Sequence, residues 1–155
     1  MQQKPSPLPA KKRMALIAHD NKKDDLKEWA SQNIDTLSAH ELFATGTTGY
    51  VLEKHLGLPV HKFISGPLGG DQQVGAHIAR GFIDVLFFFW DPFEPMPHDP
   101  DVKALLRLAA AWNIPVACNS SSADFILHSY WIDKPYSRSI PDYESYIDER
   151  TQSLS

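Results

Sequence analysis

The sequence predicts one α/β domain, a three-layer α/β/α sandwich around a five-stranded parallel sheet. Short apolar runs alternate with amphipathic segments from residue 13 to residue 150, which is typical of parallel βαβ units joined by right-handed crossovers. A length of 155 residues fits one domain, and a hydrophobic content of 43% supports a packed core. We expect a flexible tail at 1–12, the domain at 13–150 and a C-terminal tail at 151–155.

Five apolar runs are the expected strands. IDVLFFFW at 83–90 is apolar almost throughout, which indicates a central strand covered on both faces. The other four runs are MALIA at 14–18, LFA at 42–44, VHKFI at 60–64 and PVACN at 115–119.

Amphipathic segments between these strands are the expected helices. Leu26, Trp29 and Ile34 share one face of the segment at 22–34. Val102, Leu105 and Ala109 repeat in the same way within 101–113. Shorter helices are expected at 50–57, 71–81, 122–129 and 141–150, the first two of them ending at glycines.

Composition and charge exclude several classes of protein. No apolar stretch approaches the roughly 20 residues that a membrane helix needs, and the first thirteen residues lack the apolar core of a secretory signal. Cys118 is the only cysteine, which excludes a disulfide framework and a multi-cysteine metal site. The net charge is −4, with no basic stretch that favours nucleic acid. We therefore expect a cytoplasmic protein that binds neither nucleic acid nor membranes.

Unusual polar clusters follow all five expected strands. In open α/β sheets, ligands bind beyond the carboxyl ends of the strands, so these clusters predict one shared site. In chain order they are His19 with Asp20 and Lys23, TGTTG at 45–49, SGPLGGDQQVG at 65–75, the loop and helix start at 91–101, and NSSS at 119–122.

The TGTTG segment is suited to a phosphate. Thr45, Thr47 and Thr48 offer hydroxyls, and the start of the following helix offers N–H groups and the positive end of its dipole. Helix capping by threonine is the alternative explanation. Ser65 with Gly66 after the next strand, and the charge of Lys23, favour the phosphate site.

Three residues after the third and fourth strands have two interpretations each. Asp71 is equally suited to capping the helix that follows it and to acting as a general base. His98 could be an imidazole oriented by a nearby carboxylate or an exposed residue. For Asp101, dipole compensation and a functional role remain open.

Three strings, AHD at 18–20, ATGTTG at 44–49 and SGPLGGDQQVGA at 65–76, resemble the methylglyoxal synthase family. FFFWDP at 87–92, PHDPDVKALLRLA at 97–109 and IPDYESY at 140–146 strengthen the match. The resemblance implies a lyase that converts dihydroxyacetone phosphate to methylglyoxal and inorganic phosphate without metal or organic cofactor. This reaction is a glycolytic bypass. It also implies a sandwich of Rossmann- and flavodoxin-like architecture, a homohexamer and inhibition by phosphate.

The resemblance also assigns roles to individual residues. It makes Asp71 the base that abstracts a proton, places His98 at the substrate, and makes Asp20 and Asp101 secondary acidic members of the site. Arg150 resembles an arginine of the family that reaches the phosphate, and the resemblance leaves open whether it does so from its own subunit or from a neighbouring one. The remaining substrate- and phosphate-binding residues that it implies are His19, Lys23, Thr45, Gly46, Thr47, Thr48, Ser65 and Gly66.

Three other functions are compatible with an α/β sandwich that binds phosphate. The regulatory domain of carbamoyl phosphate synthetase resembles this family but would not need Asp71, His98 and Asp101 together. A receiver-type signalling domain would want a lysine after the fifth strand, where ACNSSS has none. A flavodoxin-like carrier would place its phosphate loop after the first strand, whereas TGTTG follows the second. These differences favour the enzyme.

Overall fold

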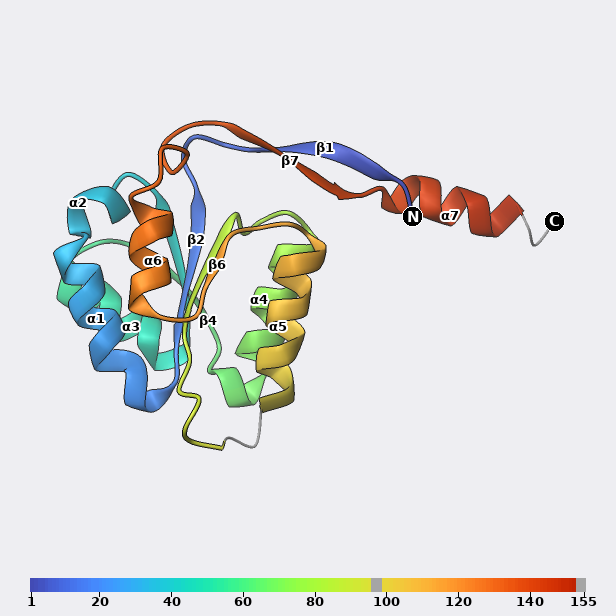
Figure 1. Ribbon diagram of the computed structural model, residues 1–155. Coiled ribbons are helices and arrows are strands. Elements are labelled where there is room, and N and C mark those ends of the chain that lie inside the picture. The colour runs from blue at the N-terminus through green and yellow to red at the C-terminus, as the bar shows by residue number, and fades with distance from the viewer. Residues whose placement is uncertain (96–98, 153–155) are drawn as a thin grey trace.

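The computed structural model describes residues 1–95 and 99–152 and confirms the expected three-layer sandwich (Figure 1). Its central sheet has five parallel strands in the order β4-β3-β2-β5-β6. They are β2 (Arg13–Ala18), β3 (Glu41–Thr45), β4 (Val60–Phe63), β5 (Val85–Phe89) and β6 (Val116–Ala117). The chain winds outward from β2 to β4 and then crosses to β5 on the other side of β2. A crevice is therefore expected at the carboxyl end of β2.

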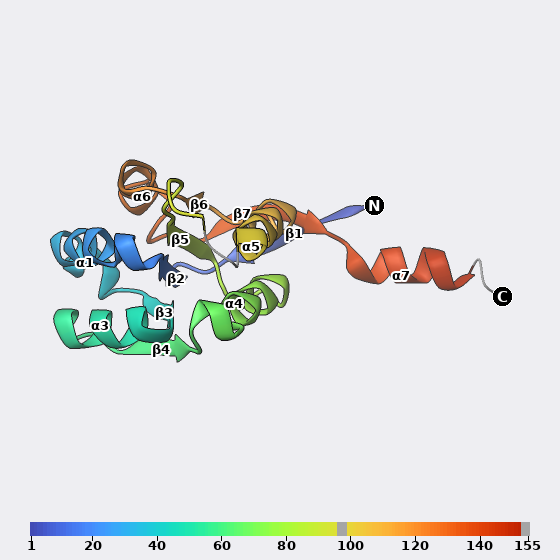
Figure 2. The ribbon, with the colours of Figure 1, turned by 90° about the horizontal axis from the view of Figure 1, so that it is seen from below.

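Helices cover both faces of this sheet (Figures 1 and 2). On one face lie α1 (Lys23–Gln32), α2 (Ile34–Leu37), α3 (Gly46–Leu56) and α6 (Ser120–Leu127), and on the other lie α4 (Gly70–Ala79) and α5 (Asp99–Ala111). Two short 3-10 turns, η1 (Asp20–Lys22) and η2 (Gly66–Leu68), follow β2 and β4. In the described residues, no helix has the length and apolar character needed to cross a membrane.

The core lies in two layers because side chains alternate along the strands. In β2, Met14 and Leu16 pack with Trp29 of α1, whereas Ala15 and Ile17 pack in the cluster that faces α4 and α5. All four of these β2 side chains are buried. A strand covered on both faces reads as a continuous apolar run, which explains why the sequence identified the central strands so clearly.

A two-stranded ribbon and a helix extend away from the sandwich. Strand β1 (Gln3–Leu8) pairs antiparallel with β7 (Tyr136–Pro141), from Gln3 opposite Pro141 to Leu8 opposite Tyr136. Helix α7 (Tyr143–Gln152) follows β7 and buries none of its residues. Both views show this arm, residues 3–8 with 136–152, projecting beyond the sheet (Figures 1 and 2).

The arm differs from the expected flexible tail at residues 1–12. Pro5 and Pro7 suggested a disordered segment, yet both lie inside β1. Proline is tolerated in a two-stranded ribbon because each strand is an edge, and a missing N–H on the outer side breaks no ladder bond. The partner strand stands more than a hundred residues away in the sequence, so local composition could not indicate it. The domain boundaries at 12 and 151 stay a prediction.

A buried ion pair joins the first and fourth strands of the sheet at their amino ends. Asp84, whose side chain is 1% exposed, accepts from Arg13 Nε at 2.9 Å and from Arg13 Nη2 at 2.8 Å. The backbone N–H of Arg13 also donates to Asp84, at 2.8 Å. These hydrogen bonds raise the pKa of the Arg13 guanidinium. The pair fixes where the chain enters the sheet.

We expect Asp84→Ala to lower the free energy of unfolding by about 3 kcal/mol, because it leaves the partly buried Arg13 without its carboxylate. Urea denaturation monitored by circular dichroism measures the change. Asp24→Ala is the control, since it breaks an exposed pair with Lys27 at 2.9 Å and should leave the midpoint unchanged. Equal midpoints for both variants would contradict the importance of the buried pair.

Candidate active site

One cavity, of about 390 Å³, lies at the carboxyl ends of β2, β3 and β4. It gathers ten of the residues that the sequence predicts for the site, and we call it the site cavity. These residues are His19, Asp20, Lys23, Thr45, Gly46, Thr47, Thr48, Ser65, Gly66 and Asp71. They come from three separate segments of the chain, which the parallel sheet brings to one edge.

The loops after β3 and β4 meet closely in this cavity. Gly46 has φ of +42°, and a Cβ added to it would stand 2.4 Å from Ser65 Oγ and 2.7 Å from Ser65 Cα. The Gly46 N–H also donates to the carbonyl of Ile64 at 3.2 Å. Only glycine permits this approach and this backbone conformation together. The two phosphate-suited segments of the sequence therefore form one wall.

Helix α3 begins at Gly46, earlier than the sequence indicated, so Thr47 and Thr48 lie in its first turn. Thr45 is the N-cap residue, but its side chain makes no capping hydrogen bond. Thr45 and Thr48 are nevertheless buried, at 5% and 4% exposed. The capping explanation for Thr45 thus fails, and the hydroxyls line a cavity at a helix N-terminus, an arrangement suited to an anion.

Lys23 connects the end of β2 with the start of α3. Its ammonium donates to Asp20 Oδ1 at 2.6 Å and to Thr47 Oγ1 at 2.7 Å. Its side chain is 28% exposed, so the ammonium lies at the cavity rather than in bulk solvent. Together with the positive end of the α3 dipole, this ammonium favours an anion on this side of the cavity, because the paired carboxylate of Asp20 is 80% exposed and is screened by solvent.

Asp71 also lines the cavity and is only 4% exposed. It is inside α4, whose N-cap is Gly69, in a left-handed conformation with φ of +109°. Asp71 is therefore not the N-cap residue, and the capping interpretation is wrong. A Cβ on Gly66 would stand 3.0 Å from Asp71 Oδ2, so the carboxylate packs directly over the η2 backbone.

His19 is held at the end of β2 by backbone contacts. Its N–H donates to the Phe89 carbonyl at 3.1 Å, and its Nδ1 accepts from the Asp91 N–H at 3.3 Å. Its ring meets the edge of Phe88, with 5.2 Å between ring centroids. His19 as a residue is 6% exposed and lines the site cavity. The partners Phe88, Phe89 and Asp91 all belong to β5 or to the loop after it. The two central strands β2 and β5 therefore hold His19 in place together.

Comparisons with known proteins agree with this site. A family model described as MGS-like domain matches residues 25–118. Methylglyoxal synthase of Saccharophagus degradans is 64% identical over 154 residues, covering 99% of this chain and 100% of that protein. The Cellvibrio japonicus methylglyoxal synthase is 62% identical over 152 residues, covering 98% and 99% of the two chains. This chain belongs to the methylglyoxal synthase family. It is therefore an enzyme.

A solved structure supports the same assignment. The crystal structure of methylglyoxal synthase from Elizabethkingia anophelis NUHP1 superposes with a TM-score of 0.87 and 51% sequence identity. The match covers 93% of this chain and 95% of that one. The methylglyoxal synthase fold thus extends through nearly the whole chain rather than a part of it.

Three predicted site residues lie outside the cavity or outside the described residues. His98 falls in the segment 96–98, which is not described. Asp101, in the first turn of α5, accepts from Gln72 Nε2 at 2.8 Å and is not among the described residues that line the cavity. Arg150 lies on α7 with its guanidinium 4.8 Å from the centre of the Tyr146 ring.

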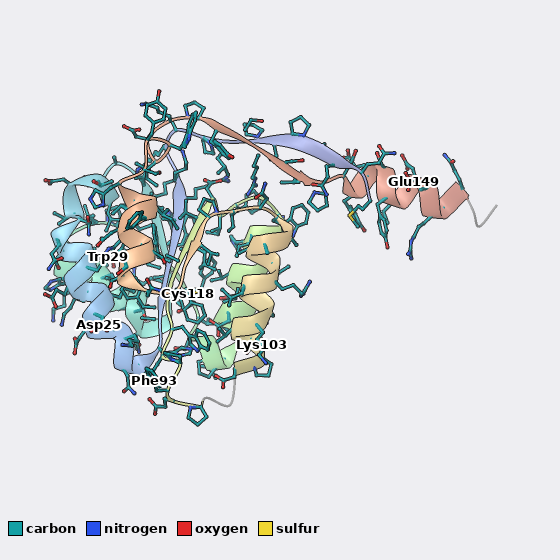
Figure 3. All side chains as sticks on the ribbon, in the orientation of Figure 1. Asp25, Trp29, Phe93, Lys103, Cys118 and Glu149 are labelled. Atoms are coloured by element: carbon teal, nitrogen blue, oxygen red, sulfur yellow. The ribbon has the colours of Figure 1, made fainter. Side chains whose placement is uncertain are left out.

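The position of Arg150 follows from the arm. Glu149, its neighbour in the sequence, lies well away from the sandwich in Figure 3. Phe93 lies at the other end of the molecule, beside the carboxyl ends of the strands (Figure 3). Within one chain, the fold therefore does not bring Arg150 to the site cavity.

Sequence reasoning missed the apolar part of the cavity wall. Ile17, Ala18, Pro67 and Phe88 also line it. Ile17 and Ala18 end β2, and Pro67 directly follows Gly66, so adjacency to predicted polar residues was a usable signal. Phe88 offered none, since it lies within an unbroken apolar run.

We expect Gly46→Ala to weaken binding of inorganic phosphate about tenfold. The added methyl must displace Ser65, which would then lose its hydrogen bond to the charged phosphate. Isothermal titration calorimetry measures the affinity. Gly57→Ala is the matched control, since Gly57 also has a positive φ, of +67°, but no atom within 4 Å of the added Cβ. Equal affinities for the two variants would contradict the role of the close approach.

Proposed function

We propose that this chain is a lyase that converts dihydroxyacetone phosphate to methylglyoxal and inorganic phosphate. One observation carries the proposal: the same cavity holds a buried carboxylate, Asp71, and an electropositive wall at the start of α3. A substrate that is both a carbon acid and a phosphate ester needs these two features at a short separation. Membership of the methylglyoxal synthase family supports the same reaction.

We assign the phosphate to the wall formed by the segments after β3 and β4. Thr45, Gly46, Thr47, Thr48, Ser65 and Gly66 offer hydroxyls and N–H groups there, and Lys23 supplies the positive charge. Hydrogen bonds and the α3 dipole act on the same anion. Inorganic phosphate, the product, fits the same groups, so we expect it to compete with the substrate.

Asp71 is the proposed base. It removes a proton from the carbon that bears the hydroxyl, and the electrons move onto the neighbouring carbonyl oxygen to give an enediolate. A free aspartate, with a pKa of about 3.9, is a weak base for a carbon acid. Asp71 alone therefore supplies only part of the required rate enhancement. The larger gain must come from stabilising the charge on the substrate oxygen.

Neutral imidazoles are the proposed stabilisers of that oxygen. His19 lines the cavity, and His98 is assigned to the same task on the family resemblance. A neutral imidazole donates a hydrogen bond and can return a proton, as in the handling of a similar enediolate by triosephosphate isomerase. Asp20 and Asp101 are assigned supporting roles. Asp20 acts through its contact with Lys23, and Asp101 acts through its contact with Gln72.

Elimination then completes the reaction. The carbon–oxygen bond to the phosphate breaks, its electron pair leaves with the phosphate, and the resulting enol takes up a proton at carbon to become methylglyoxal. The breaking bond must stand perpendicular to the enediolate plane so that its orbital overlaps the π system. The phosphate-binding wall therefore has to set a torsion as well as bind an anion.

The test is an assay of the purified protein with dihydroxyacetone phosphate in which methylglyoxal and phosphate are both measured. Equal release of the two products is expected. Phosphate binding without turnover would instead favour a regulatory binding module, which needs the electropositive wall but not Asp71.

We expect Asp71→Asn to lower kcat on the order of 10³-fold, since it removes the general base, while phosphate still binds. Steady-state kinetics and calorimetry measure the two effects. Thr48→Ala should instead act mainly on KM, because that hydroxyl belongs to the phosphate-binding wall. Near-normal phosphate release by Asp71→Asn would exclude Asp71 as the base.

We further propose a homohexamer of the cytoplasm in which Arg150 reaches the phosphate of a neighbouring subunit. The arm supports this arrangement, because α7 buries none of its residues and extends beyond the sandwich (Figure 1). A helix of ten residues is marginal in water by itself, so a second subunit is the natural surface for it.

Mixed oligomers distinguish the two possible positions of Arg150. Asp71→Asn and Arg150→Ala chains are each expected to be nearly inactive alone. After refolding together in equal amounts, about a quarter of the sites should combine an intact Asp71 with an intact Arg150 if the arginine comes from a neighbour. Recovery of about a quarter of the wild-type rate is therefore expected. If Arg150 acts within its own chain, no site is restored and no activity returns.

A further inference from the structure

The side-chain amide of Asn21 bridges two carboxylates of the loop that follows β5. Its Nδ2 donates to Asp91 Oδ2 at 3.2 Å and also to Glu94 Oε2. Asn21 itself lies in η1, directly after Asp20, and is exposed. It is not among the described residues that line the site cavity. Its contacts therefore connect the loop after β2 with the loop after β5.

These contacts fix the orientation of Asp91. Its second carboxylate oxygen, Oδ1, accepts from the Phe93 N–H at 3.0 Å, so both oxygens are engaged. The Phe93 N–H and then the Asn21 amide lower the pKa of the Asp91 carboxyl. Asp91 is 8% exposed and does not line the described part of the cavity. It thus organises the loop and its backbone rather than touching a ligand.

The backbone N–H of Asp91 is the group that reaches the site. It donates to His19 Nδ1 at 3.3 Å, so Nδ1 is an acceptor and carries no hydrogen. In a neutral imidazole the hydrogen then has to be on Nε2. This tautomer makes His19 a hydrogen-bond donor through Nε2, which is the form required to stabilise a developing oxyanion.

We propose that Asn21 is a positioning residue that holds the loop after β5 so that the Asp91 N–H keeps His19 in the Nε2–H tautomer. The role in turnover rests on the reaction proposed above, whereas the tautomer itself does not. Asn21 acts through Asp91 and touches no substrate.

The chemistry of the contact explains why an amide stands at this position. One NH₂ group has two hydrogens, so it can donate to both carboxylates at once. An aspartate at position 21 would place a third carboxylate beside Asp91 and Glu94 and repel them. A serine has only one hydrogen to donate and could bind one carboxylate only. An amide on a short side chain meets the requirement.

Nitrogen-15 NMR of the imidazoles tests the proposal without any turnover. Long-range proton–nitrogen correlations distinguish the two neutral tautomers, and the His19 signals are identified by their absence from His19→Gln. The wild-type chain should show only the Nε2–H form of His19. Asn21→Ala should show a mixture of both forms. A wild-type ring in the Nδ1–H form, or an Asn21→Ala ring that keeps a single Nε2–H form, overturns the proposal.

Kinetics give the second readout. Asn21→Ala should lower kcat on the order of 10- to 100-fold, the scale expected for a misplaced group, with a smaller change in KM. Like Asn21→Ala, Glu94→Ala should lower kcat and give a mixture of His19 tautomers. Glu94→Gln keeps an acceptor oxygen and should largely restore the wild-type kcat and tautomer. A loss of kcat with an unchanged tautomer overturns the proposal.

Asn33→Ala is the matched control for Asn21→Ala. It also removes a side-chain amide, one that donates to the Trp29 carbonyl at 2.9 Å, outside the site cavity. It should leave both the His19 tautomer and kcat unchanged, and an equal effect in this control overturns the proposal. If the wild-type protein releases no methylglyoxal, the proposed function fails while the NMR comparison still decides the tautomer.

Discussion

The close approach of Gly46 to Ser65 is the contact on which the site depends. It brings the loops after β3 and β4 so near that a single methyl group would not fit between them. The start of α3 and the η2 turn therefore present their N–H groups and hydroxyls to the same space. Parallel strands place both loops at one edge of the sheet. The missing side chain of Gly46 allows its backbone to contact Ser65.

The same geometry brings groups of opposite charge into one cavity. The ammonium of Lys23 and the start of α3 make one wall electropositive, while the Asp71 carboxylate packs over Gly66. An anion held at the first wall would repel a carboxylate placed beside it. The arrangement is useful only for a ligand whose phosphate and acidic carbon are different atoms of one molecule. The proposed substrate has this property.

Different interactions stabilise the arm and the sandwich. The sandwich buries apolar side chains on both faces of its sheet, with Asp84 and Arg13 paired at the amino end. The arm, residues 3–8 with 136–152, has two paired strands and a helix that buries nothing. Such a ribbon is marginal in isolation, which agrees with the proposal that it contacts other subunits.

The sequence by itself determined the fold class, the five sheet strands and ten of the residues in the site cavity, because strand periodicity and contiguous motifs are local properties. It also indicated the family. Only the tertiary structure decided that Gly69 rather than Asp71 caps α4, that residues 3–8 form a strand, and that Asp101 contacts Gln72. The contact of Asn21 with Asp91 could not be predicted from the sequence either. Each of these depends on backbone conformation or on partners distant in the chain, and no local pattern of residues encodes either.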